Sequence, residues 1–285
     1  MKSHSFIVEG KKDIDLEKIS CDPSGDFDKK SLKELLQKNV EQLKEIQSRL
    51  YAENQWGVLV IFQAMDTAGK DDAIKHVMTG FNPQGTQVKS FKQPSSEELD
   101  HDYLWRAHKY MPERGNIGIF NRSYYEEVLV VKVHNLLKKQ SLPSSTITDD
   151  VWKQRYRQIN DFEKYLLENG ILTVKIFLHI TKEEQKNRLL SRIDDESKNW
   201  KFAELDIAER KYWDKYQKAY AECIKYTSTK ESPWFVVPAN NKWYARAAVS
   251  EILSEVLNYL NPQYPMLSKE QLDKLDLYKA QLLQE

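Results

Sequence analysis

Residues 64–71 combine an anion-binding motif with an acid that such a motif usually excludes. The stretch reads A-M-D-T-A-G-K-D and follows the apolar run "WGVLVIF" at residues 56–62. It approaches the phosphate-loop pattern G-x-x-x-x-G-K-[ST], in which backbone N–H groups and a lysine hold phosphate at a helix N-terminus. Gly69 and Lys70 match the pattern, but Ala64 replaces its first glycine and Asp71 its hydroxyl residue. The stretch therefore indicates phosphate binding without the hydroxyl that ligates Mg²⁺ in nucleotide-binding loops.

Asp66 lies inside this loop, where a carboxylate next to a bound polyanion is unfavourable unless a cation separates them. Mg²⁺ in proteins takes one or two carboxylates together with phosphate oxygens and water, so Asp66 is a candidate Mg²⁺ ligand. An alternative is that Asp66 caps the following helix. Asp71 and Asp72 either take part in metal binding or only offset the dipole of that helix. Lys75 is either a further phosphate ligand or a solvated side chain.

A second polar group follows the apolar run "NIGIF" at residues 116–120. In open α/β sheets, ligands collect at the carboxyl ends of strands. Arg122 can donate to two phosphate oxygens, and Asn121 can bind a substrate group or a metal ion. Ser123 is explained as the cap of the next helix, with Glu126 completing a capping box.

The polar segment "QKNRLLSRIDDESKNWKF", at residues 185–202, is rich in cations. Arg188 and Arg192 stand four residues apart on one helical face, where like charges disfavour a helix. One reading is that the acids at residues 194–196 neutralise this pair. The other is a lid that carries Arg188, Arg192, Lys198 and Lys201 over a transferring phosphoryl group.

Alternating strand and helix patterns are expected to position these groups. The alternation predicts βα units and one α/β domain with a mostly parallel sheet of about five strands. The expected strands are 56–64, 86–91, 116–120, 171–180 and 234–239. The expected helices are 29–54, 71–80, 95–111, 123–137, 151–168, 182–193, 203–227 and 243–260. Residues 1–27 read as polar and irregular, and residues 266–285 carry a weak amphipathic pattern.

The composition excludes a global electrostatic attraction to nucleic acid or to membranes. The chain has 285 residues, with 43 Lys plus Arg and 43 Asp plus Glu. No run approaches the ~20 apolar residues that span a bilayer. Cys21 and Cys223 have no metal-ligand spacing and suit a reducing compartment. We therefore expect a cytoplasmic protein that binds neither nucleic acid nor membrane.

Five segments in unbroken order resemble the second family of polyphosphate kinases: residues 65–85, 90–115, 117–134, 188–202 and 232–253. The resemblance implies a P-loop kinase-like three-layer fold over residues 29–262, with a helical lid at about 183–210. A polar arm, 1–28, would precede this domain and a helical tail, 263–285, would follow it. The implied activity is reversible, Mg²⁺-dependent transfer of the terminal phosphoryl group of inorganic polyphosphate to AMP and ADP, giving ADP and ATP.

The resemblance also implies roles for individual residues. Asp66 would bind Mg²⁺, with Asn121 as a second candidate ligand. Arg122 would steady the acceptor phosphate, with Asn121 and Glu126 beside it in the nucleotide site. The implied catalytic residues are Asp66, Lys70, Arg122, Arg188 and Arg192. The implied polyphosphate ligands are Ala68, Gly69, Lys70, Asp71, Lys75, Arg188, Arg192, Lys198 and Lys201.

Asn121 stands where many members of that family carry aspartate, and it resembles the subgroup called class III, which phosphorylates both AMP and ADP. An amide adds no repulsion against the phosphate of AMP. GMP and GDP are further candidate acceptors, and the resemblance implies a homodimer or homotetramer. Two other functions stay open. An ATP-dependent nucleotide or nucleoside kinase would normally keep the missing hydroxyl, and a noncatalytic subunit would not need the charged strand-end groups.

Overall fold

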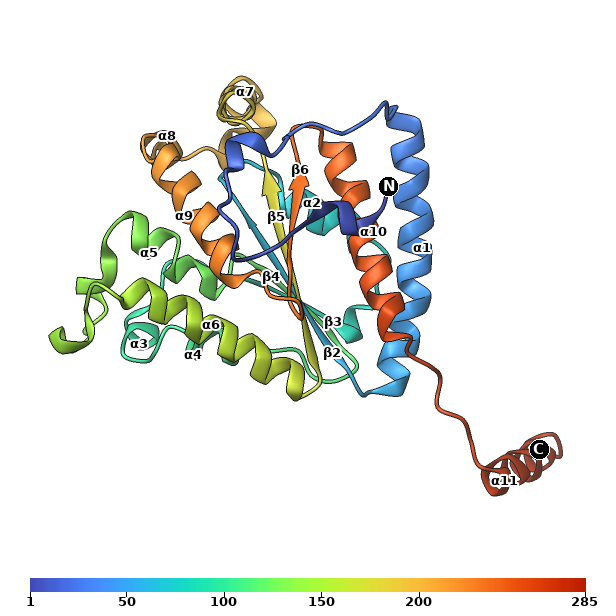
Figure 1. Cartoon of the computed structure of the whole chain (residues 1–285). Helices are drawn as coiled ribbons and strands as arrows, with labels where there is room; N and C mark the ends of the chain where they lie inside the picture. The colour runs from blue at the N-terminus through green and yellow to red at the C-terminus, as the bar shows by residue number, and fades with distance from the viewer.

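The computed structural model describes residues 1–285 and has helices on both faces of a six-stranded sheet (Figure 1). The strands lie in the order β1-β6-β5-β2-β4-β3. They are β1 (Ile7–Val8), β2 (Gly57–Ala64), β3 (Thr86–Ser90), β4 (Ile117–Asn121), β5 (Ile171–His179) and β6 (Trp234–Pro238). All neighbouring pairs are parallel except β1 with β6. The expected α/β class is confirmed, and the five expected strands form the parallel part of the sheet.

Strand β2 lies at the centre of the sheet, and all eight of its residues are buried. It pairs with β5 on one side and with β4 on the other. A strand covered on both faces needs a continuous apolar run rather than an alternating one, which is why "GVLVIF" was readable as a strand. Its carboxyl end leads directly into residues 65–69, so the sheet fixes the start of the phosphate loop.

Helices α1, α2 and α10 cover one face of the sheet, and α6 and α9 cover the other (Figure 1). Helix α1 begins where the Asp28 carboxylate accepts hydrogen bonds from the N–H groups of Lys30 and Ser31. Its apolar stripe packs against α10. The longer helices are α1 (Lys29–Glu53), α2 (Lys70–Val77), α6 (Val151–Glu168), α7 (Lys182–Asp194), α8 (Glu204–Arg210), α9 (Trp213–Thr227), α10 (Lys242–Leu260) and α11 (Lys269–Leu282).

The helix expected at residues 95–111 is wrong as a single element. It consists of α3 (Ser96–Leu99) and α4 (Trp105–His108). The carboxylate of Asp102 accepts a hydrogen bond from the N–H of Leu104, at 2.9 Å, and this turn restarts the chain in a new direction. Ser95 is the expected cap, and its capping box with Glu98 is present.

The helix expected at residues 123–137 is also wrong, because it is divided into η4 (Tyr124–Glu127), α5 (Val130–Val133) and η5 (Leu136–Lys139). The segment is rich in valine, whose branched side chain fits a helix poorly, and Asn135 adopts a left-handed φ of 53°. Ser123 does cap, but its hydroxyl accepts from the N–H of Tyr125, so the predicted capping box with Glu126 does not form. The helix expected at 203–227 is likewise divided between α8 and α9.

The N-terminal arm is more ordered than its polar sequence suggests. Phe6 and Leu16 are buried in the main core, and β1 pairs with the outer edge of β6. Buried His179, at the end of β5, bonds through Nε2 to the carbonyl of Leu16 at 2.9 Å. The arm is therefore held to the core at specific points, which the sequence did not predict. Its buried apolar residues, Phe6 and Leu16, are too far apart in the sequence to form a periodic pattern.

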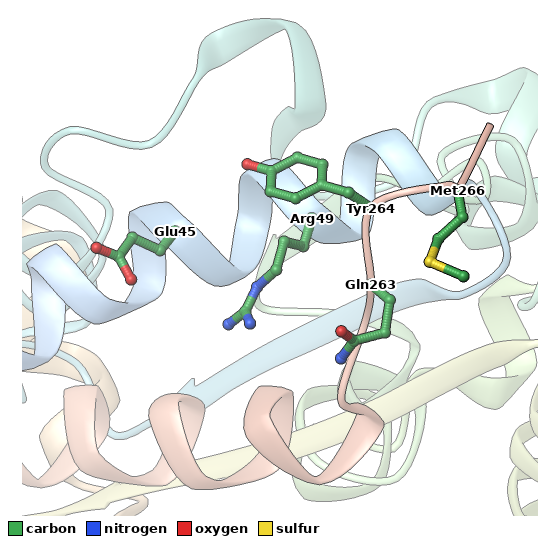
Figure 2. Close-up of a pocket in the computed structure, with 5 residues that line it drawn as sticks. All are labelled: Glu45, Arg49, Gln263, Tyr264 and Met266. Carbon is green, nitrogen blue, oxygen red and sulfur yellow. The ribbon is translucent and has the colours of Figure 1, made fainter. Parts of the chain in front are cut away.

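The C-terminal tail leaves the body of the protein after α10, and α11 stands apart from it (Figure 1). No residue of α11 is buried. An open hollow of about 720 Å³ lies where the connecting segment passes α1, and Figure 2 shows its lining of Glu45, Arg49, Gln263, Tyr264 and Met266. This hollow does not include any of the candidate site residues. No helix has the length and apolarity required to cross a membrane.

Candidate functional site

The phosphate loop, defined as residues 65–69, turns the chain from β2 into α2 with backbone conformations that ordinary residues avoid. Gly69 has a φ of 104° and caps α2, and Thr67 has a φ of 66°. A left-handed φ is a genuine outlier for a branched residue such as threonine, and such strain concentrates at functional sites. Several N–H groups of the loop and first helical turn donate to no other group of the protein: those of Thr67, Gly69, Lys70, Asp71 and Asp72. The turn therefore offers free donors at a helix N-terminus, as an anion site requires.

Three carbonyls of the same loop accept hydrogen bonds from side chains of α7. Gln185 donates to the carbonyl of Asp66 at 3.1 Å. Nη1 of Arg188 donates to the carbonyls of Thr67, at 3.1 Å, and Ala68, at 2.7 Å. Three consecutive peptide groups are thus held from one side.

Arg188 uses every donor it has within the protein. Its Nε donates to Glu184 at 2.6 Å, and its Nη2 donates to the carbonyls of Ala239, at 2.6 Å, and Asn240, at 3.0 Å. The residue is only 6% exposed. The structure therefore places Arg188 on the carbonyl side of the phosphate loop, with all five of its N–H donors bonded within the protein.

Asp66 is joined to the second strand end. Its Oδ1 accepts from Nη2 of Arg122 at 2.9 Å, and both side chains are partly exposed. Arg122 follows β4 and has a left-handed φ of 62°, a second strained position at the same edge of the sheet. No side chain caps α2, so the alternative role of Asp66 as a helix cap is excluded. Asp66, the acid of the loop, thus has a cationic partner within the protein.

Lys70 and Glu126 complete this charged cluster. Nζ of Lys70 donates to the carbonyl of Ala64 at 3.0 Å. Burial and the neighbouring Arg122 lower the pKa of Lys70, against the opposing effect of Asp66, Glu126 and other acids. Burial raises the pKa of Glu126, although Arg122 and Lys70 oppose that shift. The structure therefore brings together Asp66, Lys70, Arg122 and Glu126, as the sequence predicted.

The other acids of the first helical turn have partners inside the protein. Asp71 accepts a hydrogen bond from the side-chain amide of Asn121, and Asp72 forms an ion pair of 2.6 Å with Arg246. Arg246 is nearly buried and packs on the ring of Trp243. Asp72 therefore has a structural explanation, whereas Asn121 and Asp71 face each other across the candidate site.

Three polar residues of the site were missed from the sequence. Gln185 holds the loop, Arg246 holds Asp72, and the fully buried Gln63 donates to the Ser123 hydroxyl at 3.1 Å. The available signals were a polar residue three positions before Arg188 on the same helix, and single polar residues inside the apolar runs "VIFQA" and "WYARAAV".

The lid segment, residues 192–207, is tied together mainly by its own residues. Arg192 donates to the Asp206 carboxylate at 3.2 Å, and Lys198 pairs with Asp195. The alternative reading, in which the acids at residues 194–196 neutralise the arginine pair, is excluded because the arginine partners are Glu184 and Asp206. Asp195 does neutralise a cation, but that cation is Lys198.

The lid comes near the phosphate loop at α8. Burial raises the pKa of Asp206, and the charge of Asp66 raises it further, so these two acids share one electrostatic environment. Lys198 and Lys201 are exposed on the lid, and Lys75 is exposed on α2 without an ion-pair partner. These three lysines remain predicted phosphate ligands.

No preassembled metal centre exists among the described residues 1–285. No three His, Cys, Asp or Glu side chains converge on a common point, and Cys21 and Cys223 are both free and buried. His101 stacks on Trp105 and belongs to no group of three potential metal ligands. Mg²⁺ commonly needs only one or two carboxylates because phosphate oxygens and water complete its shell. The partly exposed Asp66 fits that manner of binding.

Comparison with known proteins bears directly on this site. The family model described as Polyphosphate kinase 2 (PPK2) matches residues 26–265. The chain belongs to the polyphosphate kinase 2 family. It is 47% identical over 288 residues to the "ADP-polyphosphate phosphotransferase" of Rhodopseudomonas palustris, covering 99% of each chain. It is 44% identical to the "AMP/ADP-polyphosphate phosphotransferase" of Meiothermus ruber, covering 93% of this chain and 96% of that one.

A solved structure of the polyphosphate kinase 2 family has the same fold. The crystal structure of Polyphosphate Kinase 2 from Arthrobacter aurescens TC1 matches with a TM-score of 0.87 at 39% identity, covering 98% of this chain and 97% of that one. The expected P-loop kinase-like fold and the expected kinase class of enzyme are confirmed. The motif-based resemblance had therefore identified the right family from the phosphate loop, the second strand end and the lid.

Proposed function

We propose that this polyphosphate kinase 2 transfers the terminal phosphoryl group of inorganic polyphosphate to AMP and to ADP, reversibly, forming ADP and ATP. The observation that carries the proposal is an aspartate, Asp66, inside a loop whose N–H groups are free to bind an anion. The names of the two relatives, one acting on ADP and one on both AMP and ADP, support both acceptors. A homodimer or homotetramer remains part of the proposal.

We place the end of the polyphosphate chain at the free N–H groups and at Lys70. Lys70 has one bond to the protein, to the carbonyl of Ala64, so its ammonium keeps donors for phosphate. Arg192, Lys198, Lys201 and Lys75 would then bind units farther along the chain. Asp71 faces this region but points a carboxylate at it, so its contribution is through the Asp71 N–H group.

The proposed reaction needs charge compensation more than covalent chemistry. An oxygen of the acceptor phosphate attacks the terminal phosphorus in line, a new P–O bond forms, and the P–O bond to the rest of the chain breaks. The shortened polyphosphate leaves with the electron pair of that bond. Lys70 and Arg122 flank the reacting groups and offset the charge on their oxygens. Positioning and charge neutralisation supply most of the rate.

Asp66 would hold Mg²⁺, which when bound supplies Lewis-acid compensation between the phosphate groups. Asn121 is the second proposed ligand through its side-chain oxygen, because its amide nitrogen already donates to Asp71. On the acceptor side, Arg122 would exchange its bond to Asp66 for bonds to the nucleotide phosphate. Glu126 lies beside Arg122 and would keep that guanidinium oriented.

The deciding experiment offers long-chain polyphosphate as the only phosphoryl donor to AMP in the presence of Mg²⁺. Appearance of ADP and then ATP, followed by chromatography, is the expected result. A parallel reaction replaces polyphosphate with ATP and uses a nucleoside acceptor. Turnover only in the second reaction would support an ATP-dependent kinase, which Asp71 at the hydroxyl position disfavours. No transfer in either would favour a noncatalytic role.

A further inference from the structure

We propose that Arg188 is a positioning residue that sets the direction of the phosphate-loop N–H groups, and that it does not contact polyphosphate. The inference deepens the proposed function, on which it rests, and it departs from the lid role that the sequence pattern had assigned to this arginine. It is carried by the five hydrogen bonds of one buried guanidinium and by the peptide groups that accept them.

The first step concerns peptide geometry. All peptide bonds of the chain are trans, so the N–H of each residue points away from the carbonyl of the residue before it. Fixing the carbonyls of Asp66, Thr67 and Ala68 toward α7 therefore turns the following N–H groups toward the opposite side. Two of those N–H groups, of Thr67 and Gly69, are free. The side chains of α7 thus determine where the anion site opens.

The second step concerns strain. Thr67 sits in a left-handed conformation that a branched residue rarely adopts, and such a conformation persists only where surrounding contacts enforce it. The Thr67 carbonyl accepts from Arg188, and the carbonyls on either side are bound by Gln185 and by Arg188 again. These hydrogen bonds are the contacts that hold Thr67 in its left-handed conformation.

The third step concerns what Arg188 would lose by turning toward a phosphate. Nη2 also holds the carbonyls of Ala239 and Asn240, in the turn between β6 and α10, and Nε holds Glu184. Leaving these buried acceptors without a donor is costly, and one phosphate contact would not replace them. Arg192, four residues later on the same helix, has only Asp206 and one carbonyl as partners, so it is the arginine that is available to an anion.

The test compares R188K and R188M with a control, K186M, in which an exposed lysine of the same helix is removed. If Arg188 positions the loop, both substitutions lower kcat by about 100-fold, the size expected for misplacing reacting groups. Amide hydrogen exchange becomes faster at Ala68 and Ala73, whose N–H groups bond to the carbonyls of Met65 and Gly69 in the same turn. The slope of log Kd for polyphosphate of uniform length against log salt stays at the wild-type value, because no phosphate contact is lost. K186M leaves all three measurements unchanged.

Two outcomes overturn the proposal. In one, R188K keeps near wild-type turnover, which shows that a charge alone is sufficient. In the other, the salt slope falls by about one in R188M, as expected when a phosphate-contacting cation is removed. Should both Arg188 variants fail to fold, Q185L takes their place. It removes the bond to the Asp66 carbonyl and the bond that Gln185 accepts from Arg210, leaves Arg188 intact, and must give the same faster exchange with an unchanged slope. The exchange measurement needs no turnover, so it remains decisive if the wild type transfers nothing from polyphosphate.

Discussion

The phosphate loop and the lid segment, which we propose both bind polyphosphate, are held in opposite ways. The loop is fixed by residues far away in the chain, such as Arg188 on α7 and Arg122 after β4. The lid is held mostly by its own residues: Asn199 donates to the carbonyls of Arg192 and Ile193, and Lys198 pairs with Asp195. Trp200 on the lid is 78% exposed.

This difference separates two tasks of a phosphoryl-transfer enzyme. A cradle for the reacting phosphate must be preorganised, so its groups are fixed from several directions. A segment that closes over a polymer must move as a unit. Its hydrogen bonds and ion pairs therefore form mainly within the segment, and few of them join it to the rest of the protein. Substitutions in the loop should therefore change the chemical step, whereas substitutions in the lid should change only polymer binding.

The largest effect is expected from D66N in the loop. Replacing the proposed Mg²⁺ ligand by a neutral amide should lower kcat by about 10³-fold or more, since charge compensation at the reacting phosphates is lost. Steady-state assays with polyphosphate and AMP over a range of Mg²⁺ concentrations would measure it. The matched lid control is D195N, which should stay within a few-fold of wild type. Near-normal turnover by D66N would remove Asp66 from the metal role.

The next effect is expected from R122A at the second strand end. Loss of a charged hydrogen-bond donor, at roughly 1.5–3 kcal/mol, should raise KM for AMP by about 10- to 100-fold. The Kd for polyphosphate should change little, and separate titrations of the two ligands would show the split. R114A is a control, since Arg114 is exposed and bonds to the carbonyl of Asn169 away from the site. An equal loss for both ligands would contradict the acceptor role.

A smaller effect is expected from the double variant K198A/K201A on the lid. KM for polyphosphate should rise by about 3- to 10-fold and the salt dependence of binding should become shallower, because two exposed cations are removed. The melting temperature should stay the same, since exposed ion pairs contribute about 0–1 kcal/mol. A thermal melt beside the binding titration checks both. A drop in kcat with unchanged KM would break the contrast between lid and loop.

The smallest effect concerns pH. Burial lowers the pKa of Lys70 below the ordinary value of 10.5, so its charge is lost at a lower pH than that of an exposed lysine. The alkaline decline of kcat/KM for polyphosphate should therefore begin below the usual lysine range. The kcat profile should decline later, because bound phosphate favours the charged amine. K75A should leave both profiles in place, and a decline only at ordinary lysine pH would contradict the assignment.

Much of the fold could be predicted because single segments carried the information. The continuous apolar run of β2 and the periodic stripe of α1 each identify an element without help from the rest of the chain. The divided helices at 95–111 and 123–137 could not be predicted, because a periodic pattern does not reveal a turn such as the one at Asp102. β1 was missed because two residues are too few to show a pattern.

The sequence predicted which residues form the candidate site, but it did not predict which groups those residues hydrogen-bond. Asp66, Lys70, Arg122 and Glu126 do lie together, since the carboxyl ends of neighbouring parallel strands meet at one edge. The partners of Arg188 could not be seen, because it bonds to backbone carbonyls as far as 121 residues away, and a carbonyl has no residue-specific signature. Motif reasoning therefore found the charged groups, whereas the backbone partners of Arg188 became visible only in the structure.

The short pairing of Ile7 and Val8 with β6 covers part of one edge of the sheet. An exposed edge strand as apolar as "WFVV" in β6 would be a template for aggregation, because its backbone groups could pair with another chain. The N-terminal arm pairs with part of this edge. The opposite margin, β3, carries the exposed polar residues Gln87 and Ser90 and the partly exposed Lys89 beside an exposed Val88, and polar and charged side chains on an edge discourage strand addition. A chain lacking residues 1–8 should therefore form aggregates, visible as light scattering on storage, under conditions in which the full chain stays clear.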